Sequence, residues 1–475
     1  MAAMQIAFDN SYARLPERFY TRQSPVPVKA PKLLAFNAAL AADLGIDLPD
    51  PEVLAEIAAG NRVPEGAEPL AQVYAGHQFG GFSPQLGDGR AMLLGEVVTE
   101  AGRFDIQLKG SGRTPYSRMG DGRAWLGPVL REYVVSEAMA ALGVPTSRAL
   151  AAVTTGESVF REQGALPGAV LTRVAASHIR VGTFQFFAAR RDTEALQTLF
   201  DHVVARHYPD AIDPVALLAS VIAAQSRLVT HWMAVGFIHG VMNTDNTTLS
   251  GETFDYGPCA FGDRFHPDTV FSSIDTQGRY SYANQPRVLV WNMAQLATAL
   301  VPLMPDQDEA VAVFTKIVHA MPEQIEQSWR QRFGEKIGLA KATADDDGLI
   351  GDLLSLMAEG RADFTNTFRA LSDPEGAPRD QFLDPAAFDA WATRWEARLA
   401  EESDTHARMA RANPVFIPRN HRIEVMIAAA VSGDFGPFER LLRVLADPYT
   451  PQPDALDLTR PPAESEIVRQ TFCGT

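Results

Sequence analysis

The chain has 475 residues, with 42 Lys and Arg against 58 Asp and Glu, and its formal charge of −16 argues against a general binder of nucleic acid or of anionic membranes. Hydrophobic residues make up 46% and charged residues 21%, which supplies a sizeable core and excludes a disordered, collagen-like or coiled-coil chain. The two cysteines, Cys259 and Cys473, exclude a disulfide-dense secreted scaffold and an all-cysteine zinc site, and they favour a reducing compartment.

Residues 1–69 form an N-terminal elaboration in which proline-rich turns surround one expected helix over 32–44. Asp9 and Glu17 lie where a signal peptide would need a continuous apolar run. We therefore expect a cytoplasmic protein.

Residues 70–185 are expected to form a β-rich lobe. Glycine is dense in the first part of this segment, and the short apolar runs over 91–98 and 104–108 are typical of strands. One helix is predicted inside the lobe over 127–143, because its apolar residues recur at helical spacing.

Residues 186–300 are expected to form a mainly helical second lobe that carries the catalytic and metal-binding loops. Asp213 and Pro214 predict the beginning of a long helix that ends at Gly236. Polar residues such as Arg227 interrupt this apolar segment, so we expect a buried helix and not a membrane span.

Residues 301–475 are expected to form a helical extension and a tail. Proline and acidic residues predict that the tail over 447–475 is extended on the surface. Further helices are predicted over 291–300, 309–319, 349–371 and 385–411.

Two motifs in the β-rich lobe are typical of a nucleotide site. Gly87, Gly89 and Arg90 precede an apolar strand, where backbone N–H groups could approach phosphates and an arginine could pair with them; an ordinary hairpin turn is the alternative. Lys109 lies near the end of the next strand, and Glu132 lies on the following helix where it could pair with Lys109. Solvent-exposed charges are the alternative for both residues.

A loop follows the long helix and contains adjacent Asp245 and Asn246, with Asp255 in an Asp-Tyr-Gly turn nine residues later. Carboxylate and amide oxygens are the hard ligands that bind Mg²⁺ together with nucleotide phosphates. Each motif by itself also suits a plain turn.

The motifs follow the order of the protein-kinase signature set, which predicts a kinase-like ATP site. A protein kinase has a proton-accepting aspartate two residues after the loop histidine. Here Val241 stands two residues after His239, and valine cannot accept a proton. We expect His239 to support the loop backbone, and we expect Trp291 and the cluster over 184–187 to belong to the core.

Together these motifs closely resemble the selenoprotein O family, also called SelO or YdiU. Shorter motifs over 278–286, 291–292 and 413–421 extend the resemblance through most of the chain. The motifs that carry it are Gly87-Asp88-Gly89-Arg90, Gln107-Leu108-Lys109-Gly110-Ser111-Gly112, Asp121-Gly122-Arg123, His239-Gly240-Val241-Met242-Asn243-Thr244-Asp245-Asn246 and Asp255-Tyr256-Gly257-Pro258.

The resemblance implies an α+β, two-lobed, protein-kinase-like pseudokinase fold that binds ATP in an orientation flipped relative to protein kinases. It implies a protein adenylyltransferase that moves AMP to Ser, Thr or Tyr hydroxyls of proteins and releases pyrophosphate. The implied cofactor is Mg²⁺ or Mn²⁺, and UTP with Mn²⁺ is an alternative substrate in the family. We expect a monomer that acts on protein acceptors with a redox link.

Carried onto this sequence, the resemblance makes Asp245 the catalytic base and Asn246 and Asp255 the metal ligands, and it pairs Lys109 with Glu132. The residues that it places at the nucleotide are Gly87, Gly89, Arg90, Lys109, Asp121, Gly122, Arg173, Arg180 and Asp255.

The family carries selenocysteine or cysteine near its C-terminus, and this supports a redox role. We hypothesise a reversible disulfide between Cys259 and Cys473 that tethers the tail to the active-site loop. Two free thiols are the alternative, because cytosolic disulfides are uncommon.

Two other functions are weighed against AMP transfer. Val241 disfavours a conventional phosphotransferase, since it replaces the expected base. The complete set of metal and phosphate residues disfavours a non-catalytic, nucleotide-sensing scaffold.

Overall fold

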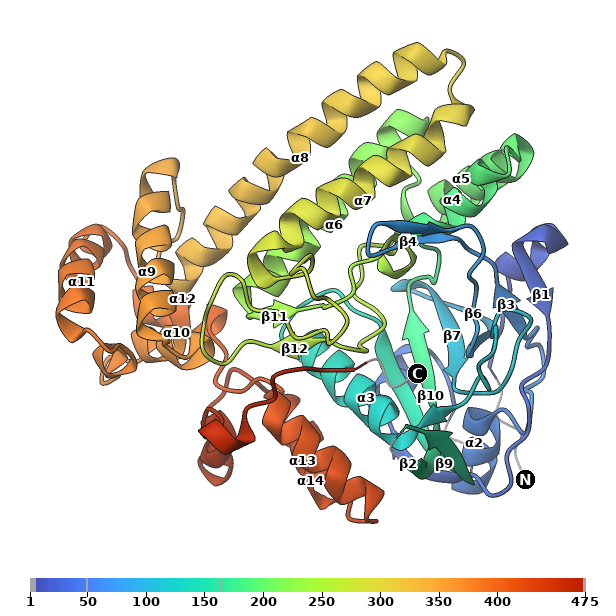
Figure 1. The fold of residues 1–475 in the computed structure, drawn as a ribbon, viewed down its shortest axis with the longest axis horizontal. Helices are drawn as coiled ribbons and strands as arrows, with labels where there is room; N and C mark the ends of the chain where they lie inside the picture. Colours follow the sequence, from blue (N-terminus) through green and yellow to red (C-terminus); the bar gives the residue numbers. More distant parts are fainter. Residues whose placement is uncertain (1–5, 48–49, 163, 473–475) are drawn as a thin grey trace.

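The computed structural model describes residues 6–47, 50–162 and 164–472, and it joins one large β-sheet to a mainly helical part (Figure 1). The sheet has eight strands in the order β1-β3-β6-β7-β10-β9-β2, with β8 paired to β10. Its strands are β1 (Tyr20–Arg22), β2 (Lys32–Phe36), β3 (Leu70–Gln72), β6 (Ala91–Thr99), β7 (Gly102–Lys109), β8 (Ala124–Trp125), β9 (Arg148–Arg161) and β10 (Gly164–Ala175). The expected mixture of α and β structure is confirmed.

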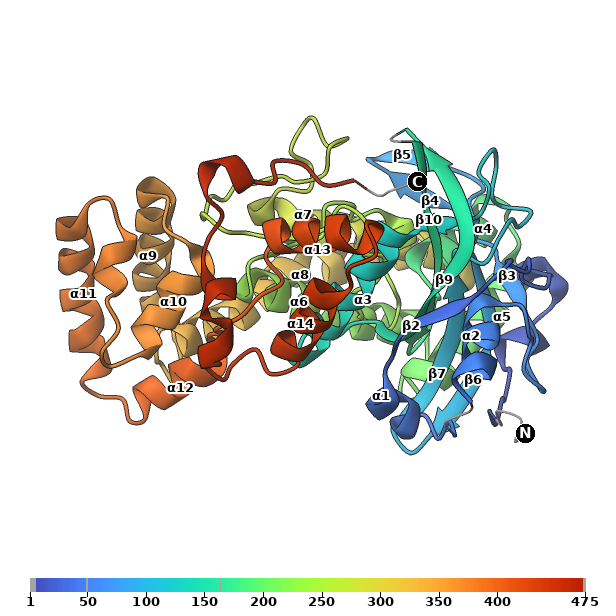
Figure 2. The ribbon, with the colours of Figure 1, turned by 90° about the horizontal axis from the view of Figure 1, so that it is seen from below.

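The two apolar runs predicted as strands form the antiparallel pair β6 and β7, in which Ala91 lies opposite Lys109. The predicted helix after them is α3 (Leu126–Ala141), which packs against β9 and β10 on one side. On the other side it contacts α13 (Asn420–Val431) and α14 (Gly436–Leu445), as Figure 2 shows. Any charged side chain in the middle of α3 is therefore withdrawn from water.

The helix expected over 32–44 is wrong in its first part. Residues Lys32–Phe36 form β2, which pairs with β9, and the helix α1 (Ala38–Asp43) begins only after them. Asn37 caps this helix by accepting a hydrogen bond from the backbone N–H of Leu40 at 3.1 Å. Pairing with a distant strand outweighs the local helical pattern here. With β1 at the other edge, the N-terminal segment supplies both outer strands of the sheet.

Two short hairpins lie outside the large sheet. The first joins β4 (Gly76–Gln78) to β5 (Gly81–Ser83), and the second pairs β11 (Phe237–Ile238) with β12 (Ala260–Phe261). Figure 1 shows β4 reaching from the sheet toward the helices, where it contacts α4 (Val181–Ala189).

The long helix predicted after Asp213 is confirmed as α6 (Pro214–Ala234). The Asp213 carboxylate accepts a hydrogen bond from the N–H of Ala216 at 2.7 Å, and Gly236 follows the helix with a left-handed φ of 71°. The other helices in this part are α5 (Thr193–His207), α7 (Gln285–Leu300) and α8 (Gln307–Lys336). Within the described ranges, no helix combines the length and the apolarity needed to cross a membrane.

The single helices predicted over 349–371 and 385–411 are wrong, because each is broken in two. Arg361 adopts a left-handed φ of 51° between α9 (Asp347–Gly360) and α10 (Phe364–Ser372), and Asp404 does the same, at 55°, between α11 (Pro385–Leu399) and α12 (Thr405–Ala412). Arg361 is the left-handed C-cap that ends α9, whereas Asp404 is the N-cap from which α12 begins, and hydrophobic spacing alone reveals neither break. Figure 1 shows these four helices at the end of the molecule opposite the large sheet.

The tail returns to the centre of the molecule. Its described part contains only short 3₁₀ turns after α14, which agrees with the extended tail that we predicted. Thr471 donates a backbone hydrogen bond to the carbonyl of Phe271 at 2.7 Å and a hydroxyl hydrogen bond to the carbonyl of Pro258 at 2.6 Å. Thr471 is therefore held against the segment that follows Asp255.

Candidate functional site

Lys109, at the end of β7, lies beneath α3 and not in solvent. Its Nζ atom donates to Oε2 of Glu132 at 2.6 Å and to Oδ1 of Asp255 at 2.5 Å. Lys109 is 8% exposed and Glu132 is 3% exposed. The alternative of two solvated charges is therefore wrong, because the strand end and the middle of a buried helix meet here. The predicted ion pair is confirmed.

Both carboxylates of this cluster are held in the ionised form. Burial opposes ionisation of Glu132, but Arg173, whose Nε lies 2.8 Å from Oε1, and Lys109 lower the pKa of Glu132 below its ordinary value. Burial opposes ionisation of Asp255 as well, but Lys109, Arg90 and Arg173 hold the pKa of Asp255 far below its usual range. Lys109 and Arg173 thus act on both carboxylates and Arg90 acts on Asp255, and cationic groups of this kind suit a phosphate-bearing ligand.

Asp245 occupies a different environment. It lies in a 3₁₀ turn over Thr244–Asn246 and is 7% exposed. Its Oδ2 atom accepts a hydrogen bond from Nε2 of Gln78 at 3.1 Å, while Oδ1 is buried and has no hydrogen-bond partner among the described residues. Burial raises the pKa of Asp245 to about 6, although hydrogen bonds and Arg180 partly oppose this shift. A carboxylate with a pKa near neutrality is suited to accepting a proton.

The oxygen atoms of Asn246 and Asp255 are of the type that Mg²⁺ and Mn²⁺ prefer. Nδ2 of Asn246 donates to the carbonyl of Val241 at 3.0 Å, which commits the amide nitrogen to the loop and leaves Oδ1 as the ligand atom. In the part of the chain that the structure describes, no group of three or more His, Cys, Asp or Glu side chains could hold a metal. The assignment of Asn246 and Asp255 as metal ligands stays a prediction, in which the remaining ligands would be phosphate oxygens and water.

His239 supports the loop backbone, as the sequence predicted. Its Nδ1 accepts a hydrogen bond from the N–H of Val241 at 3.4 Å, and its Nε2 lies 3.1 Å from the carbonyl oxygen of Phe254. Burial lowers the pKa of His239, so the ring is neutral and donates from Nε2. The side chain of Val241 is buried and offers no group for proton transfer.

Arg180 joins the glycine motif to the catalytic loop. Its Nη1 atom donates to the carbonyl of Asp245 at 3.3 Å, and its Nη2 atom lies 3.7 Å from the buried carboxylate of Asp88. The guanidinium also lies 3.9 Å from the ring centroid of Tyr74. This places a fixed positive charge between the two motifs that the sequence analysis linked.

The two glycines of the first motif allow a close approach by protein. Gly87 has a left-handed φ of 121°, and a Cβ atom added there would overlap the Tyr116 ring. A Cβ atom on Gly89 would lie 2.8 Å from the Tyr116 carbonyl oxygen. In this structure the loop over 110–123 therefore covers the motif. Arg90 lines a small cavity together with Lys109, Glu132 and Gly257.

Asp121 and Gly122 shape that covering loop. Asp121 accepts a hydrogen bond from Arg161 at 2.9 Å and is not in contact with Lys109. The carbonyl of Gly122, whose φ is 69°, accepts a hydrogen bond from the N–H of Gly112 at 3.1 Å. Of the residues placed at the nucleotide, these two are set apart from the Lys109 cluster by their contacts.

Gln185, a polar residue bonded to the loop that carries Asp245, was not predicted as a site residue. Phe184 and Phe187 are core residues as expected, but Gln185 accepts a hydrogen bond from the Thr244 hydroxyl at 2.7 Å. Trp291 is only partly buried and packs against His77, so its assignment to the core is wrong. Gln185 carries no motif, and only its place as a polar residue within an aromatic cluster could have drawn attention to it.

Cys259 is buried and carries a free thiol, and burial raises its pKa to about 12. Cys473 lies outside the described residues. The disulfide between them stays a prediction, although Thr471 donates a hydrogen bond to the carbonyl of Pro258, which precedes Cys259.

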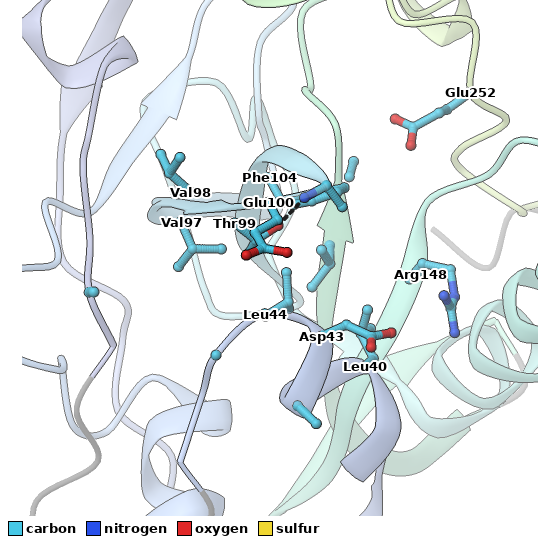
Figure 3. A pocket seen from close by; sticks show the side chains of 16 residues that line it. Leu40, Asp43, Leu44, Val97, Val98, Thr99, Glu100, Phe104, Arg148 and Glu252 are labelled. Carbon is cyan, nitrogen blue, oxygen red and sulfur yellow. Dashed lines mark hydrogen bonds between the residues drawn. The ribbon is translucent and has the colours of Figure 1, made fainter.

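A cavity of about 580 Å³ lies elsewhere, between α1 and the turn that joins β6 to β7 (Figure 3). Leu44, Phe104 and Val174 give it apolar walls, while Arg148 and Glu252 lie at its edge. None of the predicted site residues lines it, so the candidate active site is the charged cluster and not this cavity.

The chain is similar to known proteins over nearly its whole length. A family profile described as "Protein adenylyltransferase SelO" matches residues 2–446. A protein of Ruegeria sp. (strain TM1040) named "Protein nucleotidyltransferase YdiU" is 64% identical over 473 residues, which cover 99% of this chain and 100% of that protein. A protein of the same name from Ruegeria pomeroyi is 64% identical over 99% of this chain and 99% of its own length. Another, from Bradyrhizobium diazoefficiens, is 58% identical over 98% of this chain and 99% of its own length.

Proposed function

As a member of the SelO family of protein adenylyltransferases, this chain is a protein nucleotidyltransferase, and we propose that the cluster around Lys109 and Asp245 transfers AMP from ATP to protein hydroxyls. The observation that carries the proposal is the junction of Lys109 with both Glu132 and Asp255. It joins a strand lysine, a helix glutamate and a ligand-type carboxylate, the arrangement that positions nucleotide phosphates in kinase-like sites. A two-lobed, kinase-like fold is part of this proposal.

In this proposal the cationic residues bind the phosphates of the nucleotide. Lys109 and Arg173 are held by Glu132, so their side chains are oriented before the ligand binds. Arg180 is fixed by its contacts with the Asp245 carbonyl and the aromatic rings. We assign pyrophosphate stabilisation to these three residues, because arginine and lysine stabilise the charge that develops on a leaving group. The remaining residues that we assign to the nucleotide are Gly87, Gly89, Arg90, Asp121, Gly122 and Asp255.

Asn246 and Asp255 would hold the metal, Mg²⁺ or Mn²⁺. When bound, such a cation supplies charge neutralisation at the phosphate oxygens. The fit rests on the oxygen donors described above and on the ionised state of Asp255.

Asp245 is the proposed proton acceptor. The hydroxyl oxygen of a Ser, Thr or Tyr residue attacks the α-phosphorus and forms a new P–O bond. The bond from the α-phosphorus to the oxygen that bridges to the β-phosphate breaks, and pyrophosphate leaves with the electron pair. The hydroxyl proton passes to the Asp245 carboxylate, whose Oδ1 atom has no hydrogen-bond partner among the described residues. Arg180 and Lys109 favour a nucleotide whose terminal phosphates lie inward, the flipped orientation.

The broader assignments belong to the same proposal. We propose a cytoplasmic monomer that uses ATP, and UTP with Mn²⁺ as an alternative, and that modifies protein acceptors with a redox link. The family membership supports ATP as the nucleotide and proteins as the acceptors.

The test uses purified protein, Mg²⁺ or Mn²⁺ and a mixed protein acceptor, with ATP labelled in parallel at the α- or the γ-phosphate. We expect protein-bound label from the α-phosphate and none from the γ-phosphate. Label from the γ-phosphate alone would mean a phosphotransferase. Stabilisation by ATP in a thermal-shift assay, without any transfer of label, would mean a nucleotide-sensing scaffold.

A further inference from the structure

The β4–β5 hairpin contacts the catalytic loop through three consecutive residues. The backbone N–H of His77 donates to the Thr244 hydroxyl at 2.7 Å, and the backbone N–H of Phe79 donates to Oδ1 of Asn243 at 3.1 Å. Between them, Nε2 of Gln78 donates to Oδ2 of Asp245 at 3.1 Å. Three consecutive hairpin residues thus form hydrogen bonds with three consecutive loop residues, and Gln78 provides the side-chain donor to the proposed base.

Two of these acceptors on the loop, Thr244 and Asn243, form further hydrogen bonds with other side chains. The Thr244 hydroxyl donates to Oε1 of Gln185 at 2.7 Å, and the Tyr280 hydroxyl donates to Oδ1 of Asn243 at 2.6 Å. Nε2 of Gln185 lies 2.8 Å from Nδ1 of His77, which closes the network back on the hairpin. A satisfied and buried network of this kind keeps its members in one arrangement.

The backbone also approaches the carboxylate closely. A Cβ atom added to Gly76 would lie 2.5 Å from Oδ1 of Asp245, so only glycine leaves room for that oxygen atom. The two oxygens of Asp245 therefore differ. Oδ2 is committed to Gln78, whereas Oδ1 is buried beside Gly76 and is without a hydrogen-bond partner in the described ranges.

We infer that Gln78 is a positioning residue, which holds Oδ2 of Asp245 and so fixes the orientation of the carboxylate that receives the acceptor proton. The inference rests on the proposed role of Asp245. Without the Gln78 donor the carboxylate can rotate, and the fraction of molecules with the carboxylate placed for proton transfer falls. We expect nucleotide binding to depend little on this contact, because Gln78 donates to Asp245, whereas Lys109 and Arg173 lie on β7 and β10 and pair with Glu132.

The test is a double-mutant cycle with Gln78→Met and Asp245→Asn, read by transfer of α-label from ATP. Met matches Gln in length but has no donor. Because the lost hydrogen bond is made to a charged group, we expect kcat to fall roughly 10-fold in Gln78→Met, with KM for ATP unchanged. In the Asp245→Asn background the same substitution should leave the residual kcat unchanged, because the group through which Gln78 acts is gone.

A second variant guards against misfolding of the first. Gln78→Glu keeps the size of the side chain but places a carboxylate against Asp245, so its kcat should fall below that of Gln78→Met. Ser83→Ala, on the same hairpin and without a side-chain contact to Asp245, is the control and should retain full kcat. Equal losses from Gln78→Met in both backgrounds, or no loss in either, would overturn the positioning role. Full activity of Asp245→Asn alone would instead overturn the proposed base.

Discussion

The Nζ atom of Lys109 lies 2.5 Å from Oδ1 of Asp255, a residue 146 positions later in the chain. The contact joins the end of a sheet strand to a loop of the helical part, so one ammonium group belongs to both. Glu132 holds the same ammonium from α3 at 2.6 Å. The Lys109 ammonium thus pairs with carboxylates of both the helix and the loop. Substitutions can test each of these residues separately.

Lys109→Ala should lower AMP transfer at least about 100-fold, since a preorganised cation at the leaving group is removed. The fold should persist, because Glu132 keeps its pairing with Arg173 at 2.8 Å. Transfer of α-label and the thermal midpoint check the two expectations. Lys29→Ala, which removes an exposed lysine, is the matched control. Retention of activity in Lys109→Ala would remove this residue from the phosphate site.

Asp255→Ala should abolish transfer with either Mg²⁺ or Mn²⁺, because it removes a ligand oxygen and releases Lys109 from one of its partners. Metal titrations followed by transfer of α-label measure this effect. Asp268→Ala removes an exposed carboxylate nearby in sequence and should behave like the parent protein. Substantial transfer by Asp255→Ala with metal present would contradict the assignment.

Asp245→Asn should reduce kcat by roughly 10²- to 10⁴-fold and leave residual turnover, which is the usual range for loss of a general base. Binding of ATP, measured by calorimetry, should remain close to that of the parent, because the Asp245 carboxylate accepts a hydrogen bond from Gln78, and Arg180 donates to the backbone carbonyl of this residue, which asparagine retains. A large loss of ATP affinity would indicate that this carboxylate acts on the nucleotide and not on the acceptor.

A disulfide between Cys259 and Cys473 should appear after mild oxidation as a cross-linked peptide that is lost on reduction. Thr471, two positions before Cys473, donates a hydrogen bond to the carbonyl of Pro258, which precedes Cys259. Because burial raises the pKa of Cys259, the thiolate is scarce, and formation of the bridge should be slow in the folded protein. Peptide mapping under reducing and non-reducing conditions decides the matter, and two free thiols after oxidation would reject the bridge.

Glu252→Gln should make stability less dependent on pH. Burial raises the pKa of Glu252 from 4.5 to about 7, so between these values the folded state retains a proton that the unfolded state has lost. Protonated Glu252 contributes its full stabilisation of the folded state below pH 4.5, and this contribution is lost as the pH rises through 7.

At pH 8 the Glu252→Gln variant should therefore exceed the parent by roughly 1–3 kcal/mol in free energy of unfolding, and the gain should shrink toward pH 5. Urea unfolding at the two pH values provides the measurement. Glu100→Gln removes an exposed charge from the same cavity and is the control. An equal difference at both pH values would contradict a titrating Glu252.

The sequence by itself determined the residues of the charged cluster and the ends of α6. Lys109, Glu132 and Asp255 occur in motifs whose order predicts an ATP site, and the structure brings them together. Asp213 and Gly236 act on the backbone beside them, so their effect on α6 is local and visible in the sequence.

The tertiary structure alone decided the features that depend on partners far along the chain. Residues 32–36 became a strand because β9 offered an edge for pairing. Gly87 faces Tyr116 in this structure, and Gln78 reaches Asp245, 167 positions away, without any motif to mark it. Hydrophobic spacing and motifs report short-range preferences, whereas a hairpin that crosses to a catalytic loop is chosen by packing and by buried hydrogen bonds that exist only after the chain has folded.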